Sequence, residues 1–377
     1  MALLMRPRRF AGFLIAAAAL SRAAFAAPAP DPPKTRNVVL IVSDGLRWQE
    51  VFRGPDHALM TEACGGVENV EALRKEFWKE TSEEGRKALL PFFWNVIARD
   101  GQLYGNQTEG SLARDTNGLD FSYPGYNEML TGAPDARMNT NDPVPNPNVT
   151  VFEWLNRDPE LAGRVAAYAS WSVFDAIFNA PRSRLRICSG WTPAPPCLDP
   201  PVPSMLKRLY GTTTPYWDDN VWDGFLQALV LDEVRRNRPR VLFLGFGETD
   251  DWAHAGRYDL LLRSARNVDR FIEELWDAMQ AMPEYRGTTT FLITADHGRG
   301  HGLEDWKEHG DDVEGSSEIW IAALGPDTPS FGERKVAAPV TQSQIAATIA
   351  ALLGRDYRRA FPAAAPPLPD VVPRWPR

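Results

Sequence analysis

Three runs of apolar residues that end at or just before an acidic residue constrain the fold more than any other feature of the sequence. The runs and the acids that follow them are Asn37–Ser43 with Asp44, Val241–Phe246 with Asp250, and Thr289–Thr294 with Asp296. Short continuous apolar runs rich in β-branched residues predict strands that are buried on both faces. Ligands of parallel sheets bind beyond the carboxyl ends of the strands, so these acids are placed where a site is expected.

Helical patterns fall between the predicted strands. Apolar residues recur at three- and four-residue spacing from Leu261 to Met279, and a second helix is expected over Gln342–Leu353, before Gly354. Further strand-like runs lie at 164–169 and 318–323. This alternation predicts an α/β fold with a mostly parallel central sheet flanked by helices. The segment 172–236 fits the rhythm poorly and is interpreted as an inserted cap over the site.

The histidines gather with these acids. Four of the five histidines of the chain lie between positions 254 and 309, and His254, His297 and His309 accompany the acidic clusters. Carboxylate and imidazole ligands without thiolate suit zinc, with manganese or calcium as alternatives. Six such ligands suffice for two adjacent divalent ions.

A serine between the first and second acidic clusters is a candidate nucleophile. Pro124 favours a helix start, which places Ser122 at the helix N-cap, and one interpretation is that it only caps the helix. The alternative interpretation is that Ser122, at the same helix N-terminus, is a nucleophile. A hydroxyl beside a divalent metal at a helix N-terminus can lose its proton and attack phosphorus, while backbone N–H groups hold the phosphate oxygens. The metal-ligand cluster favours the nucleophile, with Ser122 itself beside the metal.

These motifs resemble the alkaline phosphatase superfamily, and most of all its type I phosphodiesterase/nucleotide pyrophosphatase branch. The resemblance rests on Ser122-Tyr123-Pro124 followed by Thr131-Gly132, with Ser in place of the more usual Thr, and on the order of the metal motifs. It implies an alkaline-phosphatase-like domain with two metal ions. One ion would be held by Asp250, His254 and His309, and the other by Asp44, Asp296 and His297, next to Ser122.

Two departures from the family pattern concern substrate binding. The family's phosphate-contacting asparagine lies about twenty residues after the nucleophile, and only Asn139 and Asn141 approximate that position. Sulfatases of the same superfamily carry an arginine four residues after the Cys or Ser that is converted to formylglycine. Tyr126 occupies that position here, which counts against a sulfatase.

The ends of the chain and its composition suggest where the protein acts. Arginines, then an uncharged apolar run, then Ala24-Phe25-Ala26 predict a signal peptide over residues 1–26, and hence a periplasmic or secreted protein with no stable membrane span. A net charge of −8 argues against coating nucleic acid. An oxidising compartment favours a disulfide between Cys188 and Cys197. Residues 27–36 form a leader, 37–361 the catalytic domain, and 362–377 a Pro-rich tail.

The expected function is a secreted, metal-dependent hydrolase of a small phosphate ester, which includes nucleotides as candidate substrates. Ser122 attacks phosphorus, and water then hydrolyses the phosphoseryl intermediate. The alternatives are a sulfatase-like hydrolase and a secreted metal-binding protein without catalysis. The sequence leaves the oligomeric state open, as well as the choice between monoester and diester.

Overall fold

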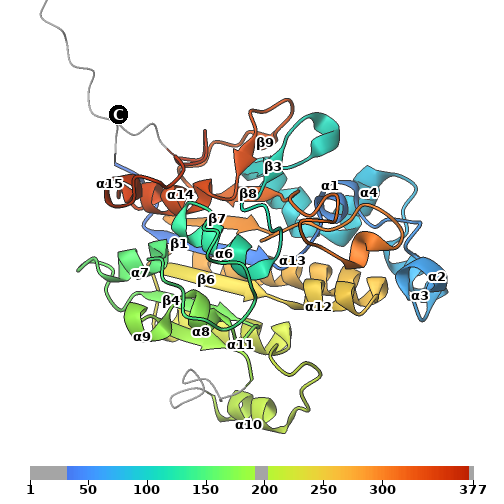
Figure 1. Ribbon diagram of the computed structural model, residues 1–377, viewed down its shortest axis with the longest axis horizontal. Helices are drawn as coiled ribbons and strands as arrows, with labels where there is room; N and C mark the ends of the chain where they lie inside the picture. The colour runs from blue at the N-terminus through green and yellow to red at the C-terminus, as the bar shows by residue number, and fades with distance from the viewer. Residues whose placement is uncertain (1–31, 192–202, 373–377) are drawn as a thin grey trace, which may run out of the picture.

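The computed structural model describes residues 32–191 and 203–372, which build an eight-stranded sheet between two layers of helices (Figure 1). The order across the sheet is β5-β4-β6-β1-β7-β8-β2-β9. Its strands are β1 (Asn37–Ser43), β2 (Gln102–Tyr104), β4 (Val165–Ala169), β5 (Arg186–Ser189), β6 (Val241–Phe246), β7 (Thr289–Thr294), β8 (Ile321–Leu324) and β9 (Gly332–Glu333). A separate two-stranded ladder joins β3 (Ala113–Arg114) and β10 (Val340–Thr341).

The helices cover both faces of the sheet. They are α1 (Trp48–Arg53), α2 (Glu62–Gly65), α3 (Val70–Phe77), α4 (Ser82–Leu89), α5 (Ala98–Asp100), α6 (Ser122–Thr131), α7 (Val151–Asn156), α8 (Phe174–Ile177), α9 (Ala180–Ser183), α10 (Ser204–Thr212), α11 (Asp223–Arg236), α12 (Glu248–His254), α13 (Tyr258–Ala281), α14 (Gln344–Leu352) and α15 (Tyr357–Ala360). The π-helical turn η1 (Phe93–Ile97) and the 3₁₀ turns η2 (Gln107–Glu109) and η4 (Asp305–Lys307) complete the described elements.

The central strand β1 is an unbroken apolar run because both of its faces are buried. Val39 and Ile41 point into one hydrophobic core, whereas Val38, Leu40 and Val42 point into another. Helix α13 contributes a stripe of apolar side chains to the first core, and helices α6, α7 and α14 pack into the second. Both faces of β1 are thus removed from water, as expected for a strand of a parallel sheet.

The predicted α/β class with a mostly parallel sheet is confirmed. The neighbours β4, β6, β1 and β7 pair in parallel, whereas β8 runs antiparallel to both β7 and β2. Strand β8 also begins at Ile321, three residues later than expected, because the backbone of the preceding residues bonds outside the main sheet: Glu318 N–H donates to the carbonyl of Gly315 at 2.9 Å and Ile319 N–H to that of Ala113 at 3.0 Å. A short apolar run does not encode the direction of its strand, so only the structure reveals this reversal.

The segment 172–236 contributes partly to the sheet. Strand β5 pairs with β4 at the sheet edge, and α11 packs its buried face into the core that also receives α13. Helix α10 protrudes at the lower end of the view in Figure 1. That this segment acts as a cap stays a prediction, and residues 192–202 within it lie outside the described part.

The Pro-rich tail packs onto the domain through 372. Ala364, Leu368 and Val371 are buried in the second core, and Tyr104 Oη donates to the carbonyl of Pro369 at 2.7 Å. The predicted signal peptide and Cys197 fall outside the described residues, so export and the Cys188–Cys197 disulfide stay predictions. Among the helices of the described residues, none combines the length and apolar character needed to cross a membrane.

Candidate metal centre and active site

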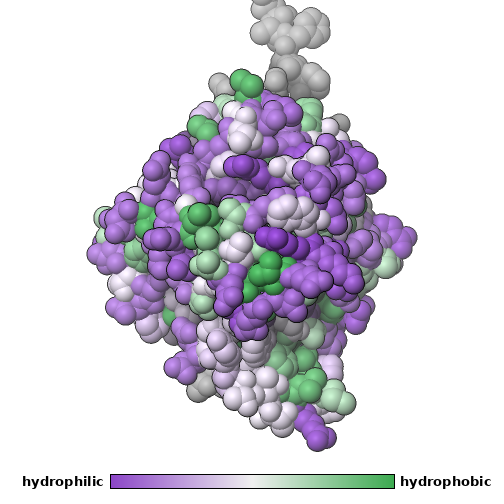
Figure 2. Space-filling model, turned by 90° about the vertical axis from the view of Figure 1, so that its right-hand side faces the viewer, coloured by the Kyte–Doolittle hydropathy of each residue, from purple (hydrophilic) through white to green (hydrophobic). Residues whose placement is uncertain are grey.

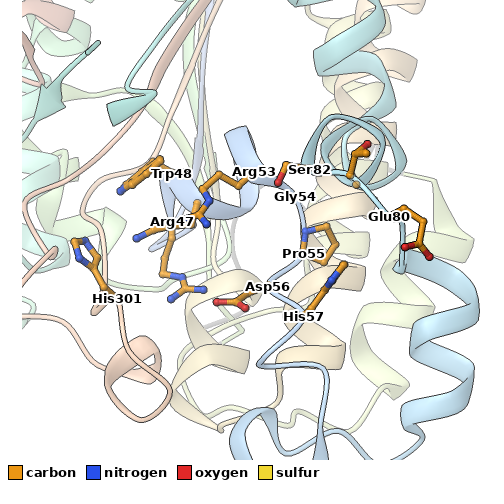
Figure 3. Close-up of a pocket in the computed structure, with 13 residues that line it drawn as sticks. Arg47, Trp48, Arg53, Gly54, Pro55, Asp56, His57, Glu80, Ser82 and His301 are labelled. Atoms are coloured by element: carbon orange, nitrogen blue, oxygen red, sulfur yellow. The ribbon is translucent and has the colours of Figure 1, made fainter. Parts of the chain in front are cut away.

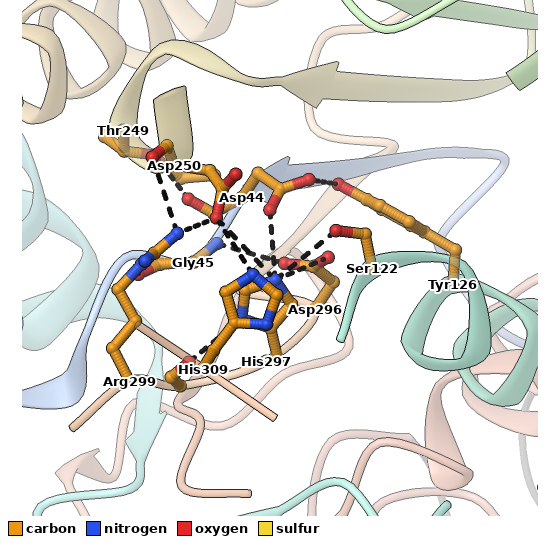
Figure 4. A network of polar contacts seen from close by, with 12 residues as sticks. Asp44, Gly45, Ser122, Tyr126, Thr249, Asp250, Asp296, His297, Arg299 and His309 are labelled. Atoms are coloured by element: carbon orange, nitrogen blue, oxygen red, sulfur yellow. Dashed lines mark hydrogen bonds and ion pairs between the residues drawn. The ribbon is translucent and has the colours of Figure 1, made fainter. Parts of the chain in front are cut away.

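Three adjacent parallel strands bring the predicted acidic ligands to one edge of the sheet. Because β6, β1 and β7 are neighbours, the loops that follow them meet beyond their carboxyl ends. Asp44 follows β1 directly, Asp296 lies two residues beyond the end of β7, and Asp250 lies in the first turn of α12. Figure 4 shows these side chains converging with His297 and His309.

Gly45 explains why the first acid is followed by glycine. Its φ of 56° lies in the left-handed region, and a Cβ there would come within 2.7 Å of Arg299 Nε and 2.8 Å of Asp250 Oδ1. Its backbone N–H donates to Asp296 Oδ1 at 3.1 Å. The backbone thus approaches the site closely and helps to orient one of the carboxylates.

The first ligand group consists of Asp44, Asp296 and His297, whose ligand atoms all lie within 4.8 Å of one another. His297 Nε2 is 3.3 Å from Asp44 Oδ1 and 3.6 Å from Asp296 Oδ2. These two carboxylate oxygens are buried and accept no hydrogen bond. Buried carboxylate oxygens without donors are costly unless a cation satisfies them, so this group fits a metal ion.

The second ligand group consists of Asp250, His297 and His309, again within 4.8 Å. His254, expected with Asp250 and His309, is also close: its Nε2 lies 3.4 Å from Asp250 Oδ2 and 3.1 Å from His309 Nε2. The structure therefore brings all six predicted ligands together. His297 belongs to both groups, which the sequence did not suggest.

Hydrogen bonds at Nδ1 leave the Nε2 atoms of two histidines directed into the site. His297 Nδ1 lies 2.9 Å from the carbonyl of Gly298, and His309 Nδ1 lies 3.2 Å from that of Asp120. Because a carbonyl oxygen only accepts, Nδ1 carries the hydrogen in each ring. The Nε2 atoms are then the ligand atoms, an arrangement common in metal-binding histidines.

The charges of the site also favour a bound cation. Burial alone would lower the pKa of His297, but the Asp296 and Asp44 carboxylates outweigh it and raise the pKa to about 10. Burial, with Asp44 as the second cause, raises the pKa of Asp296 to about 8. The first group thus holds a proton tightly where a divalent cation can replace it. Burial and the nearby His297 keep the pKa of His309 well below its ordinary value, which leaves its ring neutral for ligation.

Ser122 is the first residue of α6 and does not occupy the N-cap, contrary to expectation. The first helical hydrogen bond runs from Gly125 N–H to the carbonyl of Phe121 at 3.0 Å, so Phe121 is the N-cap residue. The Ser122 hydroxyl instead faces His297 Nε2 at 3.5 Å (Figure 4). This position removes the capping explanation for the serine and places its oxygen beside the ligand shared by both groups.

Of the two predicted asparagines, only Asn141 lies at the site. Its Oδ1 accepts a hydrogen bond from the backbone N–H of Tyr123 at 3.0 Å, and it lines the same cavity as Ser122. Asn139 does not line this cavity. The side-chain amide of Asn141 is therefore fixed next to the start of α6, with Nδ2 available to a bound group.

Tyr126 orients the first ligand group, a role that sequence analysis missed. This residue is one turn after Ser122 on α6, and its hydroxyl donates to Asp44 Oδ2 at 2.9 Å. The i and i+4 spacing could have suggested that both residues share one helix face.

Replacing Tyr126 with phenylalanine is expected to weaken metal affinity or activity by about 10- to 100-fold, as is typical when a hydrogen bond that orients a ligand is lost. Metal titration of the chelated protein measures this. The matched control is Tyr104→Phe, which removes a buried tyrosine hydroxyl bonded to Gln102 and Pro369. An equal loss in both variants would show that Tyr126 acts only through general stability.

A cavity of about 660 Å³ opens beside the ligand groups. Its lining includes Asp44, Ser122, Asp250 and His254. Sequence analysis missed several other residues that line this cavity, namely Asp142, Trp171, Asp219, Asn220 and Asp251. Among these only Asp251 carried a sequence signal, because it directly follows Asp250. The rest come from loops whose positions depend on the fold.

Several other polar or aromatic side chains that neighbour the predicted ligands in the sequence lie elsewhere. Arg47 and His301 line a separate cavity of about 400 Å³ (Figure 3). Arg299 is fully buried and ion-paired with Asp250. Trp306 is buried and donates to the carbonyl of Cys64, and Trp252 packs among other aromatic rings. None of these five side chains lines the cavity at the metal ligands.

Comparison with known proteins agrees with this geometry. The family model of type I phosphodiesterase/nucleotide pyrophosphatase matches residues 124–331. No curated protein matches the chain at a significant level. Among solved structures, phosphonate monoester hydrolase SpPMH from Silicibacter pomeroyi is 13% identical, with a TM-score of 0.53 over 89% of this chain and 76% of that one.

Two further structures share the fold. The lipoteichoic acid synthase LtaP from Listeria monocytogenes is 10% identical, with a TM-score of 0.53 over 85% of this chain and 72% of that one. Murine ectonucleotide pyrophosphatase/phosphodiesterase 5, solved with AMP, is 12% identical, with a TM-score of 0.50 over 88% of this chain and 97% of that one. Identities this low show a common alkaline-phosphatase-like fold and no more.

Proposed function

Because the chain belongs to the type I phosphodiesterase/nucleotide pyrophosphatase family, we propose that it is a secreted hydrolase of phosphoric diesters. It would depend on two divalent metal ions and attack through Ser122. The observation that carries this proposal is the Ser122 hydroxyl, 3.5 Å from the Nε2 atom of His297. His297 is the side chain shared by both ligand groups, so the position of the hydroxyl supports a role as a metal-assisted nucleophile.

The donor set supports zinc, although oxygen-rich sites also accept manganese or calcium. Asp44, Asp296 and His297 would hold one ion, and Asp250, His254 and His309 the other. When bound, the ions would supply Lewis acidity that favours the ionised serine and the charge developing on phosphate.

The residues of the chain would position and cleave the ester in two steps. In the first, the Ser122 hydroxyl loses its proton to solvent, its oxygen bonds to phosphorus, and the bond from phosphorus to the leaving oxygen breaks. The leaving alcohol takes its proton from solvent. In the second, water cleaves the phosphoseryl bond and restores the hydroxyl. Asn141 Nδ2 would hold a non-bridging oxygen of the phosphate.

The charge of the cavity favours a diester over a monoester. Its described lining contains five aspartates and neither lysine nor arginine. A phosphate monoester carries an additional negative charge near neutral pH, and this lining offers no side-chain cation to balance it. A diester carries a single charge, which two divalent ions can neutralise.

Hydrolysis of three nitrophenyl esters tests the proposal. We expect faster turnover of bis-para-nitrophenyl phosphate than of para-nitrophenyl phosphate, and none of para-nitrophenyl sulfate. A chelator should abolish the activity, and zinc or manganese should restore it, because both ligand groups require a cation. Turnover of the sulfate alone would overturn the proposed substrate class. Two bound metals without turnover of any ester would instead support a metal-binding protein without catalysis.

A further inference from the structure

Three side chains around the segment that leads to Ser122 present buried oxygen atoms without hydrogen-bond donors. Both carboxylate oxygens of Asp115, Oδ1 of Asp120 and Oε1 of Gln342 are buried, and none of these four atoms has a hydrogen-bond partner among the described residues. Asp115 is 3% exposed, and Gln342 is fully buried. Buried acceptors without donors are costly, so these oxygens require a group that satisfies them.

The backbone places the three side chains next to one another. Strands β3 and β10 run in parallel, and the N–H of Gln342 continues this ladder by donating to the carbonyl of Arg114 at 2.9 Å. Asp115 directly follows Arg114 and therefore lies beside Gln342. The turn after Asp115 folds back, with Asp120 N–H donating to Asn117 Oδ1 at 3.0 Å. The carboxyl groups of Asp115 and Asp120 are then close enough to share a proton.

The surroundings of Asp115 are unfavourable for a carboxylate without a bound cation. Burial raises the pKa of Asp115 to about 10, and the carboxylates of Asp120 and Glu128 add to this effect, whereas His297 opposes it. Negative charge is therefore concentrated around a carboxyl group that is removed from water. A cation bound between Asp115 and Asp120 would remove this penalty.

One proton is not enough to satisfy the four oxygens. A proton carried by Asp115 would be donated to Asp120 Oδ1, but the second oxygen of Asp115 and Oε1 of Gln342 would still lack a donor. Water molecules would donate hydrogen bonds and leave the buried negative charge in place. A divalent cation contacts several oxygens at once and also compensates the charge.

We propose that Asp115, Asp120 and Gln342 bind a calcium ion, at a site separate from the two ions proposed for catalysis. None of the three residues belongs to either ligand group or lines the cavity beside Ser122. Their donor atoms are carboxylate and amide oxygens, which calcium prefers, and they include no nitrogen or sulfur to favour zinc. Magnesium usually keeps several water molecules, which suits a buried site poorly.

A calcium ion at this site would hold the backbone that enters the active site. The carbonyl of Asp120 accepts a hydrogen bond from His309 Nδ1 at 3.2 Å, and the next residue, Phe121, is the N-cap of α6. Fixing the Asp120 side chain would therefore restrain both the ring of a predicted metal ligand and the start of the helix that carries Ser122. The ion would act on the nucleophile only through this backbone.

Calorimetric titration of the zinc-loaded full chain with calcium tests the site, because zinc already fills the ligand groups that contain histidine. We expect one calcium ion per chain. Asp115→Asn and Asp120→Asn each remove one ligand charge and should weaken calcium binding by at least about tenfold. Asparagine also tolerates the left-handed backbone of Asp120, whose φ is 56°. Calcium at ten times its Kd should raise the Tm of the wild-type protein by about 2 °C.

Asp269→Asn is the matched control. Asp269 is also 3% exposed, but its two oxygens accept hydrogen bonds from the backbone N–H groups of Phe92 and Phe93, both at 2.9 Å. This variant should bind calcium as the wild-type protein does. A cooperative thermal transition in each calcium-free variant shows that it is folded. Three results would overturn the inference: no calcium binding by the wild-type protein, equal binding by the Asp115→Asn and Asp120→Asn proteins, or magnesium binding as tight as that of calcium.

Discussion

Replacing Ser122 with alanine is expected to lower kcat for phosphodiester hydrolysis on the order of 10³-fold or more, because the covalent route loses its nucleophile. The metal content should stay unchanged. Carboxylates and imidazoles supply all the atoms of the two ligand groups, and the serine oxygen only lies beside them. Steady-state hydrolysis, together with elemental analysis of the same sample, measures both effects.

Two further serine variants sharpen this result. Ser122→Thr keeps a hydroxyl at the start of α6 and should retain far more activity than the alanine variant. Ser189→Ala removes a hydroxyl that donates to Asp175 Oδ1 at 3.0 Å, at the sheet edge and outside the cavity, and should behave as wild type. If Ser122→Ala hydrolyses diesters at the wild-type rate, water attacks phosphorus directly and the two-step route is wrong.

Replacing His297 with alanine is expected to reduce both metal content and activity, the latter by more than about 100-fold, since it removes a ligand rather than a residue that only orients one. His297 belongs to both ligand groups, so removing its ring should weaken metal binding at both sites. Its ring also counters the buried Asp44 and Asp296 charges, which stay uncompensated in the metal-free variant. Metal titration with calorimetry should therefore show two weakened sites.

The other histidines provide the controls. His254→Ala should weaken a single site, since His254 approaches only Asp250 and His309 among the ligands. His57→Ala should weaken neither, since His57 stacks on Trp78 with ring centroids 3.6 Å apart, away from the ligands. Two intact sites in the His297→Ala protein would contradict the shared position of this residue.

The sequence predicted the parts of the fold that depend on local pattern. The bounds of β1, β6 and β7 are those expected, because strands buried on both faces leave uninterrupted apolar runs. Once these strands were taken as parallel, their carboxyl ends had to share an edge. The convergence of Asp44, Asp250 and Asp296 could therefore be predicted without knowing any distance.

The features that the sequence did not reveal depend on how distant segments meet. Strand β8 is antiparallel, and its four apolar residues would look the same in either direction. Trp171 and Asp219 are 48 residues apart and come together only through the loops beyond β4 and α10. The predicted N-cap was wrong by one residue: the helix is capped by Phe121 and begins at Ser122. Helix boundaries depend on backbone hydrogen bonds that proline alone does not fix.

The surface is consistent with a protein whose apolar residues serve mainly the core. The face shown in Figure 2 is mostly hydrophilic, with hydrophobic residues in small groups. Exposed large hydrophobic side chains such as Met205, Leu209 and Tyr216 lie on or just after the protruding helix α10.

Mass spectrometry of the protein quenched during turnover tests the central claim most directly. The full chain, loaded with zinc and mixed with excess phosphodiester, would be stopped in acid, digested and sequenced. We predict one phosphoryl group with its retained ester substituent on Ser122, absent from the Ser122→Ala protein and from chelated samples. Modification of a different residue, or an unmodified Ser122 under conditions where the following hydrolysis step limits turnover, would contradict the proposed nucleophile.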